Sequence, residues 1–249
     1  MSISAIIITR NNEAMLSGCL ATLRWVDEII VVDSESYDKT ATIAKKYAAK
    51  IISIPAGTDY SSARNAGLNE ASSEWIFYVD ADEHVTPELK QEIKSTINDQ
   101  PSTISYKLPR MNIILGRWLK HGGFWPDYVH RLFHKDTLIK WTGKLHESPT
   151  VTGAVGLLKH PLKHYTARSI TSAMAKSRHW APIEAQLLFA AHTPQVTWWR
   201  LIKAFICKFC DVYLFKRGFL DGARGLILAY IQAHHQASVL VSLWELQHA

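Results

Sequence analysis

Two aspartates one residue apart, Asp80 and Asp82, are the residues whose spacing points most directly to chemistry. They follow residues 75–79, an apolar run of aromatic and β-branched side chains that is typical of a buried strand. Thr86 and the proline after it then predict a helix start, so the aspartates lie in a tight strand-to-helix loop. Carboxylates this close repel one another unless a cation or a proton lies between them, and hard oxygen ligands suit Mg²⁺ or Mn²⁺. We expect a divalent-metal site here; the alternative is an acidic, solvated turn.

Other polar residues lie where further strands are expected to end. The predicted strands span residues 3–9, 28–32, 51–54 and 75–79, with helices over 15–23, 40–49 and 61–69 between them. This alternation indicates a mostly parallel sheet flanked by helices, and such sheets bind ligands beyond the carboxyl ends of their strands. Thr9 and Asp33 occupy two of those ends, although each has a turn or capping role as its alternative. No glycine-rich phosphate loop follows any strand, which favours a nucleotide held by carboxylates and a metal.

Charge divides the chain into unlike parts. Residues 1–100 hold 9 Lys and Arg against 15 Asp and Glu, whereas the remainder holds 19 against 7. A basic half is suited to an anionic partner. Three cysteines argue against a disulfide framework and favour a reducing compartment. We see no signal peptide and no uninterrupted apolar run of about 18 residues, so neither secretion nor a spanning helix is expected.

Four motifs stand in one order along the first hundred residues. They are IIITRNNE at 6–13, VVDSES at 31–36, ARNAG at 63–67 and VDADE at 79–83. This series resembles the nucleotide-sugar half of the family 2 glycosyltransferases, which have the GT-A fold. The resemblance implies an α/β, Rossmann-like domain that holds a nucleobase at Thr9 and Asp33, a nucleoside near Arg64, a ribose at Asp80 and a metal-bound diphosphate at Asp82. Arg10, Glu13 and Asn65, in the same motifs, are further candidates for contact with the nucleotide sugar.

The second half supplies candidates for the acceptor side. Sugar transfer with inversion, which the resemblance implies, requires a general base for the acceptor hydroxyl. Glu147 is our candidate for that base and Asp127 is the second choice, while His146 is a candidate to complete the metal site. Arg131 is a candidate ligand for diphosphate or acceptor phosphate, as is His130 beside it. The alternatives for the His146–Glu147 pair are a packed histidine and a surface glutamate.

The last third reads as helices rich in tryptophan and cations. Residues 198–217 space apolar side chains three and four apart with Lys and Arg between them, which suits a helix lying in a membrane interface. The alternative is a helix packed on its own protein with its cations extended to solvent. We therefore expect a nucleotide-sugar half at 1–100, an acceptor half at 101–165, and a C-terminal helical, basic-aromatic appendage at 166–249.

The second half contains WPD at 125–127, RLF at 131–133, GKLHE at 143–147 and GFLDG at 218–222. This series resembles a subgroup of the family that includes the lipopolysaccharide inner-core glucosyltransferases of Gram-negative bacteria. The resemblance implies an inverting, Mg²⁺- or Mn²⁺-dependent enzyme that moves glucose from UDP-glucose to an inner-core heptose. Its acceptor would be a lipid-linked anionic glycan, met by a cytoplasmic protein bound peripherally to the anionic inner membrane. A capsule precursor or a peptide is the alternative acceptor. A nucleic-acid-binding protein is the non-enzymatic alternative, which scattered rather than clustered cations disfavour.

Overall fold

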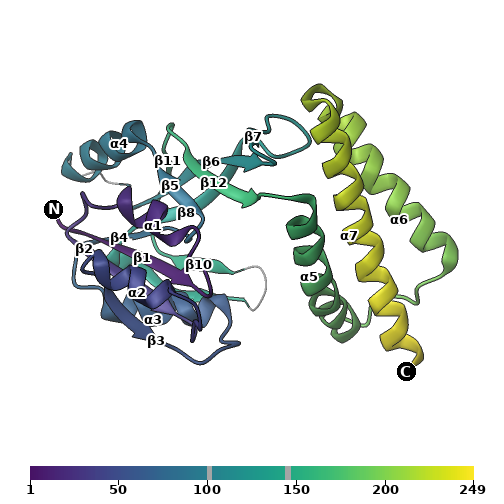
Figure 1. Cartoon of the computed structure of the whole chain (residues 1–249), viewed down its shortest axis with the longest axis horizontal. Helices are drawn as coiled ribbons and strands as arrows, with labels where there is room; N and C mark the ends of the chain where they lie inside the picture. Colours follow the sequence, from purple (N-terminus) through teal and green to yellow (C-terminus); the bar gives the residue numbers. More distant parts are fainter. Residues whose placement is uncertain (100–102, 144–146) are drawn as a thin grey trace. The chain divides into compact units, whose positions relative to one another are not determined.

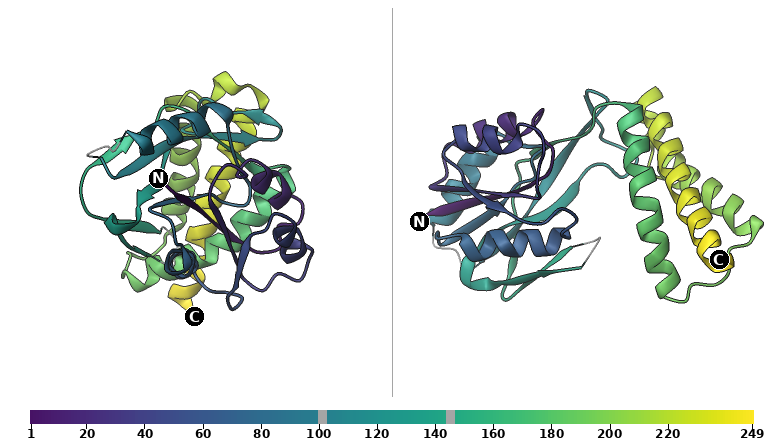
Figure 2. Two further views of the ribbon diagram at one scale, coloured as in Figure 1. Left: turned by 90° about the vertical axis from the view of Figure 1, so that its left-hand side faces the viewer. Right: turned by 60° about the horizontal axis from the view of Figure 1, so that its bottom comes forward.

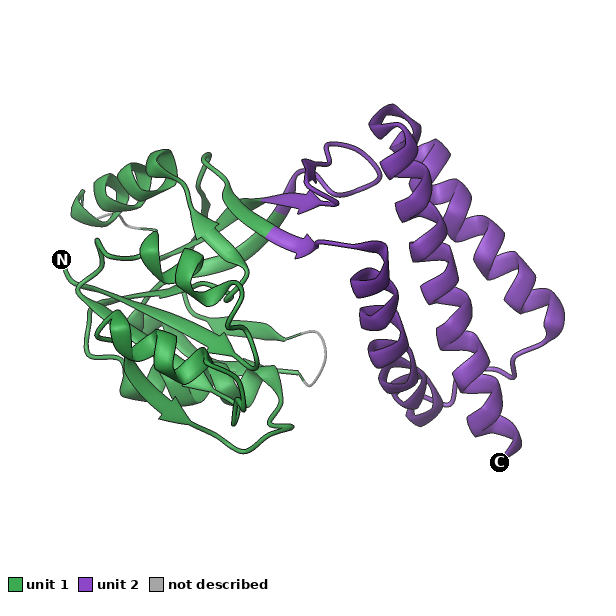
Figure 3. Cartoon of the chain, in the orientation of Figure 1, with its two compact units in different colours: residues 1–110, 128–164 green, residues 111–127, 165–249 purple. Residues whose placement is uncertain are grey.

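The computed structural model describes residues 1–99, 103–143 and 147–249 of the chain. It divides into two compact units, which Figure 3 shows in green and purple. Unit 1 comprises residues 1–110 and 128–164, and unit 2 comprises residues 111–127 and 165–249. The region expected to be a helical appendage, 166–249, therefore lies within unit 2, together with residues 111–127.

The first hundred residues of unit 1 form the alternating strands and helices that their sequence predicts (Figure 1). The strands are β1 (Ile3–Thr9), β2 (Glu28–Asp33), β3 (Lys50–Ser53), β4 (Trp75–Tyr78) and β5 (Glu83–Val85). The helices are α1 (Leu16–Ala21), α2 (Thr40–Lys46), α3 (Tyr60–Glu70) and α4 (Pro87–Asn98). The predicted cap of α4 is confirmed, because the Thr86 side chain accepts a hydrogen bond from the backbone N–H of Leu89 at 3.2 Å.

The remaining strands complete the sheet and add a hairpin. They are β6 (Ser105–Ile114), β7 (Arg117–Trp118), β8 (Asp127–His134), β9 (Leu138–Thr142), β10 (Ser148–Val151), β11 (Val155–Leu157) and β12 (Leu162–Ala167), with a 3₁₀ turn, η1 (Lys135–Thr137), before β9. The sheet runs in the order β3-β2-β1-β4-β8-β6-β12-β5, and β7 and β11 also pair with β6. The pairs among β1 to β4 are parallel, whereas β8 joins β4 and β12 joins β5 in antiparallel fashion. Strands β9 and β10 form a separate antiparallel pair.

The register of the parallel strands brings the predicted polar ends together. Thr9 at the end of β1 lies opposite Asp33 at the end of β2, and Ile6 of β1 lies opposite Tyr78 at the end of β4. Asp80 follows Tyr78 by two residues, so its loop emerges at the same edge of the sheet. The expected ligand edge is therefore present in unit 1.

Both faces of this sheet are covered, which explains why its strands are continuously apolar. Trp75 and Phe77 of β4 pack with α1 and α4 on one face, whereas Ile76 and Tyr78 pack with α3 on the other. Alternate residues of a strand point to opposite faces, so a strand buried on both faces needs an unbroken apolar run. Figure 2 shows helices of the first hundred residues, in purple and blue, on both sides of these strands.

Helix α3 approaches the sheet closely at Gly67, and this predicts a measurable cost of adding a methyl group there. A Cβ at Gly67 would lie 2.4 Å from Cγ2 of Ile6 and 3.1 Å from Cγ2 of Val32. Gly67→Ala is expected to lower the free energy of unfolding by about 1–3 kcal/mol, although alanine is the better helix former by about 1 kcal/mol. Urea unfolding measures this, with Asn69→Ala at an exposed position of α3 as the control. A Gly67→Ala protein as stable as the control would contradict the close packing.

Unit 2 is built mainly from three helices. They are α5 (Ile170–Ala190), α6 (Trp198–Cys210) and α7 (Ala223–His248), and the turn between the last two contains η2 (Asp211–Phe215) and η3 (Gly218–Asp221). Helix α7 packs against both α5 and α6, as Figure 1 shows. His235 of α7 is hydrogen-bonded to Ser177 and Glu184 of α5 at 3.0 and 3.1 Å, so it joins two helices rather than facing solvent as a free side chain.

Helix α7 contains no uninterrupted apolar run of about 18 residues, but it is long and apolar on average. Among the described residues it is the one helix with the length and composition to cross a membrane, with a mean hydropathy of 1.2 over its best window. In the structure 39% of that stretch is buried, and a core helix of a soluble protein can have the same length and composition.

Candidate active site

Glu83, the third acidic residue of the loop after β4, holds that loop in shape. Glu83 is fully buried, and its carboxylate accepts a hydrogen bond from the backbone N–H of Asp80 at 2.8 Å. It also forms ion pairs with Arg131 at 3.0 Å and Arg110 at 3.6 Å. Glu83 thus fixes the turn that presents Asp80 and Asp82.

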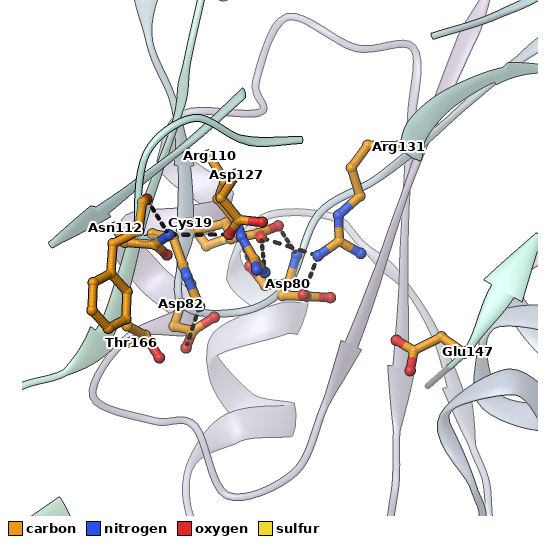
Figure 4. Close-up of polar contacts among 12 residues, drawn as sticks. Cys19, Asp80, Asp82, Arg110, Asn112, Asp127, Arg131, Glu147 and Thr166 are labelled. Atoms are coloured by element: carbon orange, nitrogen blue, oxygen red, sulfur yellow. Dashed lines mark hydrogen bonds and ion pairs between the residues drawn. The ribbon is translucent and has the colours of Figure 1, made fainter. Parts of the chain in front are cut away.

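Asp80 is held between two buried arginines, Arg64 and Arg131, and Figure 4 shows the contact with Arg131. Nη2 of Arg64 lies 3.0 Å from Oδ1 of Asp80, and Nη2 of Arg131 contacts Oδ2. Burial alone would raise the pKa of Asp80, but the charges of Arg131 and Arg64 outweigh it and hold that pKa well below its ordinary value. Burial likewise disfavours the charged form of Arg131, but Asp80 and Glu83 raise its pKa above the ordinary value. Asp80 is consequently an ionised hydrogen-bond acceptor at neutral pH.

Arg64 also connects Asp80 to the candidate base. The same Nη2 of Arg64 lies 3.0 Å from Oε1 of Glu147. The guanidinium lies over the rings of Trp141 and Tyr78, 4.9 and 5.4 Å from their centroids. These contacts orient the Arg64 side chain by charge on one side and by cation–π attraction on the other.

Asn65 positions this arrangement from the next residue of α3. Its side-chain amide donates to the carbonyl of Trp141 at 3.0 Å and accepts from the N–H of Trp141 at 2.8 Å. Both amide atoms of Asn65 are therefore engaged by β9. Asn65, a candidate nucleotide ligand, thus holds the β9–β10 hairpin against α3. Glu147 lies next to β10 of this hairpin.

Asp82 has a neighbour that the sequence analysis did not identify. Oδ2 of Asp82 lies 3.5 Å from Nε2 of His164, which β12 places opposite Glu83 of β5. Their side chains are 27% and 12% exposed. The expected partner, His146, lies outside the described residues. No group of three or more His, Cys, Asp and Glu side chains in the described ranges is arranged to hold a metal. Asp82 and His164 together supply one oxygen and one nitrogen donor, which fits a divalent cation that takes its other ligands from water and phosphate.

The first two strand ends place the remaining nucleotide-ligand candidates. Asp33 is buried and accepts hydrogen bonds from the hydroxyl and the N–H of Ser36. Oγ1 of Thr9 is buried without a hydrogen-bond partner among the described residues. Arg10 is exposed. The carboxylate of Glu13 accepts a hydrogen bond from the backbone N–H of Lys39 at 3.1 Å, so Glu13 joins the loops after β1 and β2.

A cavity of about 550 Å³ in unit 1 joins Asp80 and Glu147 to a basic wall. Lys107, Arg110 and His130 contribute to its lining. Burial, reinforced by Lys107, lowers the pKa of His130 to about 4, so its imidazole is neutral at pH 7. Lys107 is exposed and has no ion pair with any described residue. The positive charge of this wall comes from Lys107, Arg110 and Arg131, the last of which is paired with Asp80 and Glu83.

The second candidate base belongs to the other unit. Asp127 lies in unit 2, where its Oδ2 accepts a hydrogen bond from Nδ2 of Asn112 at 3.0 Å (Figure 4). Asn112 also donates to the carbonyl of Phe124 at 3.1 Å. These contacts hold the Asp127 carboxylate in place within that unit.

Comparison with known proteins now identifies the family. A model described as glycosyl transferase family 2 matches residues 4–158, more than half of the chain. The chain belongs to this family. The predicted transferase activity and the resemblance in sequence are confirmed for a family 2 glycosyltransferase.

Individual relatives agree with this assignment. An uncharacterized glycosyltransferase of Rickettsia felis is 26% identical over 98% of this chain and 89% of its own length. The lipopolysaccharide core biosynthesis glycosyltransferase LpsC of Rhizobium meliloti is 23% identical over 94% of this chain and 91% of its own. A TPR repeat-containing protein of Synechococcus elongatus is 36% identical over 43% of this chain, and that match spans 27% of the Synechococcus protein.

Solved structures confirm the predicted fold of this family 2 glycosyltransferase. One of them is glucosyl-3-phosphoglycerate synthase from Mycobacterium tuberculosis, in complex with Mn²⁺, UDP and glucosyl-3-phosphoglycerate. It superposes with a TM-score of 0.51 at 17% identity, covering 78% of this chain and 81% of the synthase. The α/β domain with a mostly parallel sheet and flanking helices is therefore the one expected from the sequence.

Proposed function

We propose that this glycosyltransferase moves a hexose, with inversion and with the aid of Mg²⁺ or Mn²⁺, from a UDP-sugar to a lipid-linked anionic glycan. Glucose is the proposed sugar and a lipopolysaccharide inner-core heptose the proposed acceptor. The observation that carries the donor assignment is the ionised Asp80 between Arg64 and Arg131, one residue away from the Asp82–His164 pair. In this proposal the ionised Asp80 would accept hydrogen bonds from ribose hydroxyls, and the Asp82–His164 pair would bind the metal ion.

The donor would lie along the carboxyl edge of the parallel strands. The unpartnered Oγ1 of Thr9 and the buried Asp33 are the proposed contacts of the base, with Arg64 beside the nucleoside. Asp82 and His164 would hold the metal, which when bound neutralises the charge of the departing diphosphate. The synthase structure with UDP and Mn²⁺ supports this choice of donor and metal for the fold.

Glu147 is the proposed general base that takes the proton of the acceptor hydroxyl. In the proposed reaction the hydroxyl oxygen bonds to the anomeric carbon, the bond from that carbon to the diphosphate breaks, and the proton passes to the Glu147 carboxylate. Glu147 lines the same cavity as Asp80, and Arg64 keeps its carboxylate oriented. Asp127 remains the alternative base.

The acceptor is proposed to be anionic because the cavity at Glu147 has a cationic wall. Arg110 and Arg131 in that wall have described acidic neighbours, whereas Lys107, also in the wall, has none among the described residues. A phosphate or carboxylate on the acceptor glycan would supply the opposite charge. The likeness to LpsC, named for lipopolysaccharide core biosynthesis, supports a glycan of this kind over a capsule precursor or a peptide.

Release of UDP tests the proposal. The purified chain would be incubated with UDP-glucose and a panel of other sugar nucleotides, with Mn²⁺ or with EDTA, and with inner-core glycans that carry or lack phosphate. Release of UDP that requires Mn²⁺ and is stimulated by the phosphorylated heptose acceptor is the expected result. Stimulation by a capsule precursor or a peptide alone would overturn the acceptor. Release of UDP that is unaffected by EDTA would contradict the proposed dependence on a metal ion.

The metal assignment predicts a loss of metal dependence in UDP binding. Asp82→Asn keeps the shape of the side chain but removes its charge, and His164→Gln removes the nitrogen donor, so each is expected to weaken UDP binding in Mn²⁺ by about 10–100-fold. Binding in EDTA should stay as in the wild type. Titration calorimetry measures both, with Asp136→Asn, an exposed carboxylate in unit 1, as the control. Undiminished Mn²⁺-dependent binding in both variants would contradict the assignment.

A further inference from the structure

Helix α6 exposes apolar side chains that nothing in unit 2 covers. None of its thirteen residues, all of them described, is buried. Trp198, Trp199, Ile202 and Ile206 are 74%, 60%, 41% and 54% exposed. Their spacing of three and four residues places Trp199, Ile202 and Ile206 along one side of the helix. The opposite side faces α7, where Phe205 meets Tyr230 with ring centroids 6.1 Å apart.

The turn after α6 continues this apolar surface. Phe215 is 80% exposed, and Leu214, Phe219 and Leu220 are each about half exposed. The turn is held in shape from within unit 2, because Gly122 donates to the carbonyl of Lys216 at 2.8 Å and the N–H of His121 donates to Asp221 at 2.9 Å. A second constraint is the ion pair of Lys216 with Asp211 at 2.7 Å. Phe215 and Phe219 are thus presented outward by an ordered turn.

The same segment carries an excess of positive charge. Residues 198–220 contain five Lys and Arg and one Asp. The cations are Arg200, Lys203, Lys208, Lys216 and Arg217. Lys216 and Arg217 are both exposed and lie between Phe215 and Phe219. Aromatic rings interleaved with cations match a bilayer interface, where rings enter the headgroup boundary and cations meet anionic lipid.

We propose that residues 198–220 form a docking surface for an anionic lipid bilayer. A protein partner fits less well, because the cores of protein interfaces are depleted in lysine, whereas Lys203 and Lys216 lie among the exposed apolar residues. Large contiguous apolar patches on monomeric proteins commonly mark interaction sites. This inference does not depend on the donor or acceptor proposed above.

Flotation of the full chain with vesicles tests the surface. Phosphatidylcholine vesicles with and without phosphatidylglycerol would be compared at low and high salt. Binding is expected to need the anionic lipid and to weaken with salt. Lys203→Gln with Arg217→Gln should lower the partition coefficient about 25-fold, since each interfacial cation contributes about fivefold. Both side chains are exposed, and Lys216 is left in place because its ion pair with Asp211 holds the turn. Phe215→Ser should lower it at least about tenfold. Lys45→Gln with Lys46→Gln, the same charge change on exposed residues of unit 1, should leave it unchanged.

Three results would overturn the proposal. They are no binding to either vesicle, equal binding to neutral vesicles, and equal losses in the Lys45/Lys46 control and in the Lys203/Arg217 variant. Retention on the vesicles after an alkaline carbonate wash would instead indicate that α7 spans the bilayer. Far-ultraviolet circular dichroism and UDP binding confirm that each variant is folded, so that a loss of flotation reports on the surface.

Discussion

Replacing Glu147 by glutamine is expected to lower kcat by about 10²–10⁴-fold, the usual contribution of a positioned general base. Glutamine keeps the size of the side chain and a hydrogen-bonding oxygen toward Arg64, but it does not accept the proton of the acceptor hydroxyl. The affinity for UDP should remain within a small factor of the wild-type value. Single-turnover kinetics with UDP-glucose, together with UDP titration, separate the two quantities.

Asp127→Asn is the matched control for that result. Asn112 donates to Asp127, and an asparagine in its place still presents a carbonyl oxygen to that donor. If Asp127→Asn shows the large loss of kcat and Glu147→Gln does not, the base is Asp127. A loss of UDP affinity equal to the loss of kcat in Glu147→Gln would instead indicate that Glu147 acts by holding Arg64.

Replacing Arg131 by methionine is expected to lower the free energy of unfolding by about 3 kcal/mol, the lower end of the cost of breaking a buried ion pair. The variant loses one of the two arginines that pair with each carboxylate, while Arg64 still pairs with Asp80 and Arg110 with Glu83. Arg131 is 4% exposed and pairs with both Asp80 and Glu83. Methionine fills a similar volume, so the loss reports on charge rather than on a cavity. Urea unfolding at pH 7 measures it, with Arg117→Met at an exposed position as the control.

The difference in the free energy of unfolding between the wild type and Arg131→Met is expected to depend on pH. The pKa of Asp80 is depressed in the folded wild type, so the stability it contributes is present above its unfolded pKa of about 4 and is lost as the pH falls through the folded value. In Arg131→Met the pKa of Asp80 should lie higher. The gap between wild type and variant is therefore expected to narrow as the pH falls from about 5 to 3. A gap independent of pH would show that Arg131 stabilises by packing alone.

The sequence sufficed to predict the parallel strands and the residues at their ends. The signal is local, since a continuous apolar run followed by Thr9, Asp33 or Asp80 carries both the strand and its polar end. The cap at Thr86 is equally local. These features follow from the preferences of a few consecutive residues, which a single sequence displays.

The contacts that complete the site could not be predicted because they join residues far apart in the chain. His164 meets Asp82 only through the antiparallel pairing of β12 with β5. Arg131 reaches the loop after β4 from β8 and pairs there with Glu83, while its predicted contact with phosphate stays a prediction. Nothing in the residues around His164 or Arg131 indicates which strand becomes the neighbour of which, so their partners follow from the sheet order alone.

The two hydrogen bonds between Asn65 and Trp141 hold the hairpin by its main chain. These two hydrogen bonds involve no side chain of the hairpin. Trp141 is constrained in a second way, because its ring lies against Arg64. Substitutions along β10 therefore leave the attachment to α3 intact. The attachment of this hairpin to α3 is therefore separate from the surface that β10 presents.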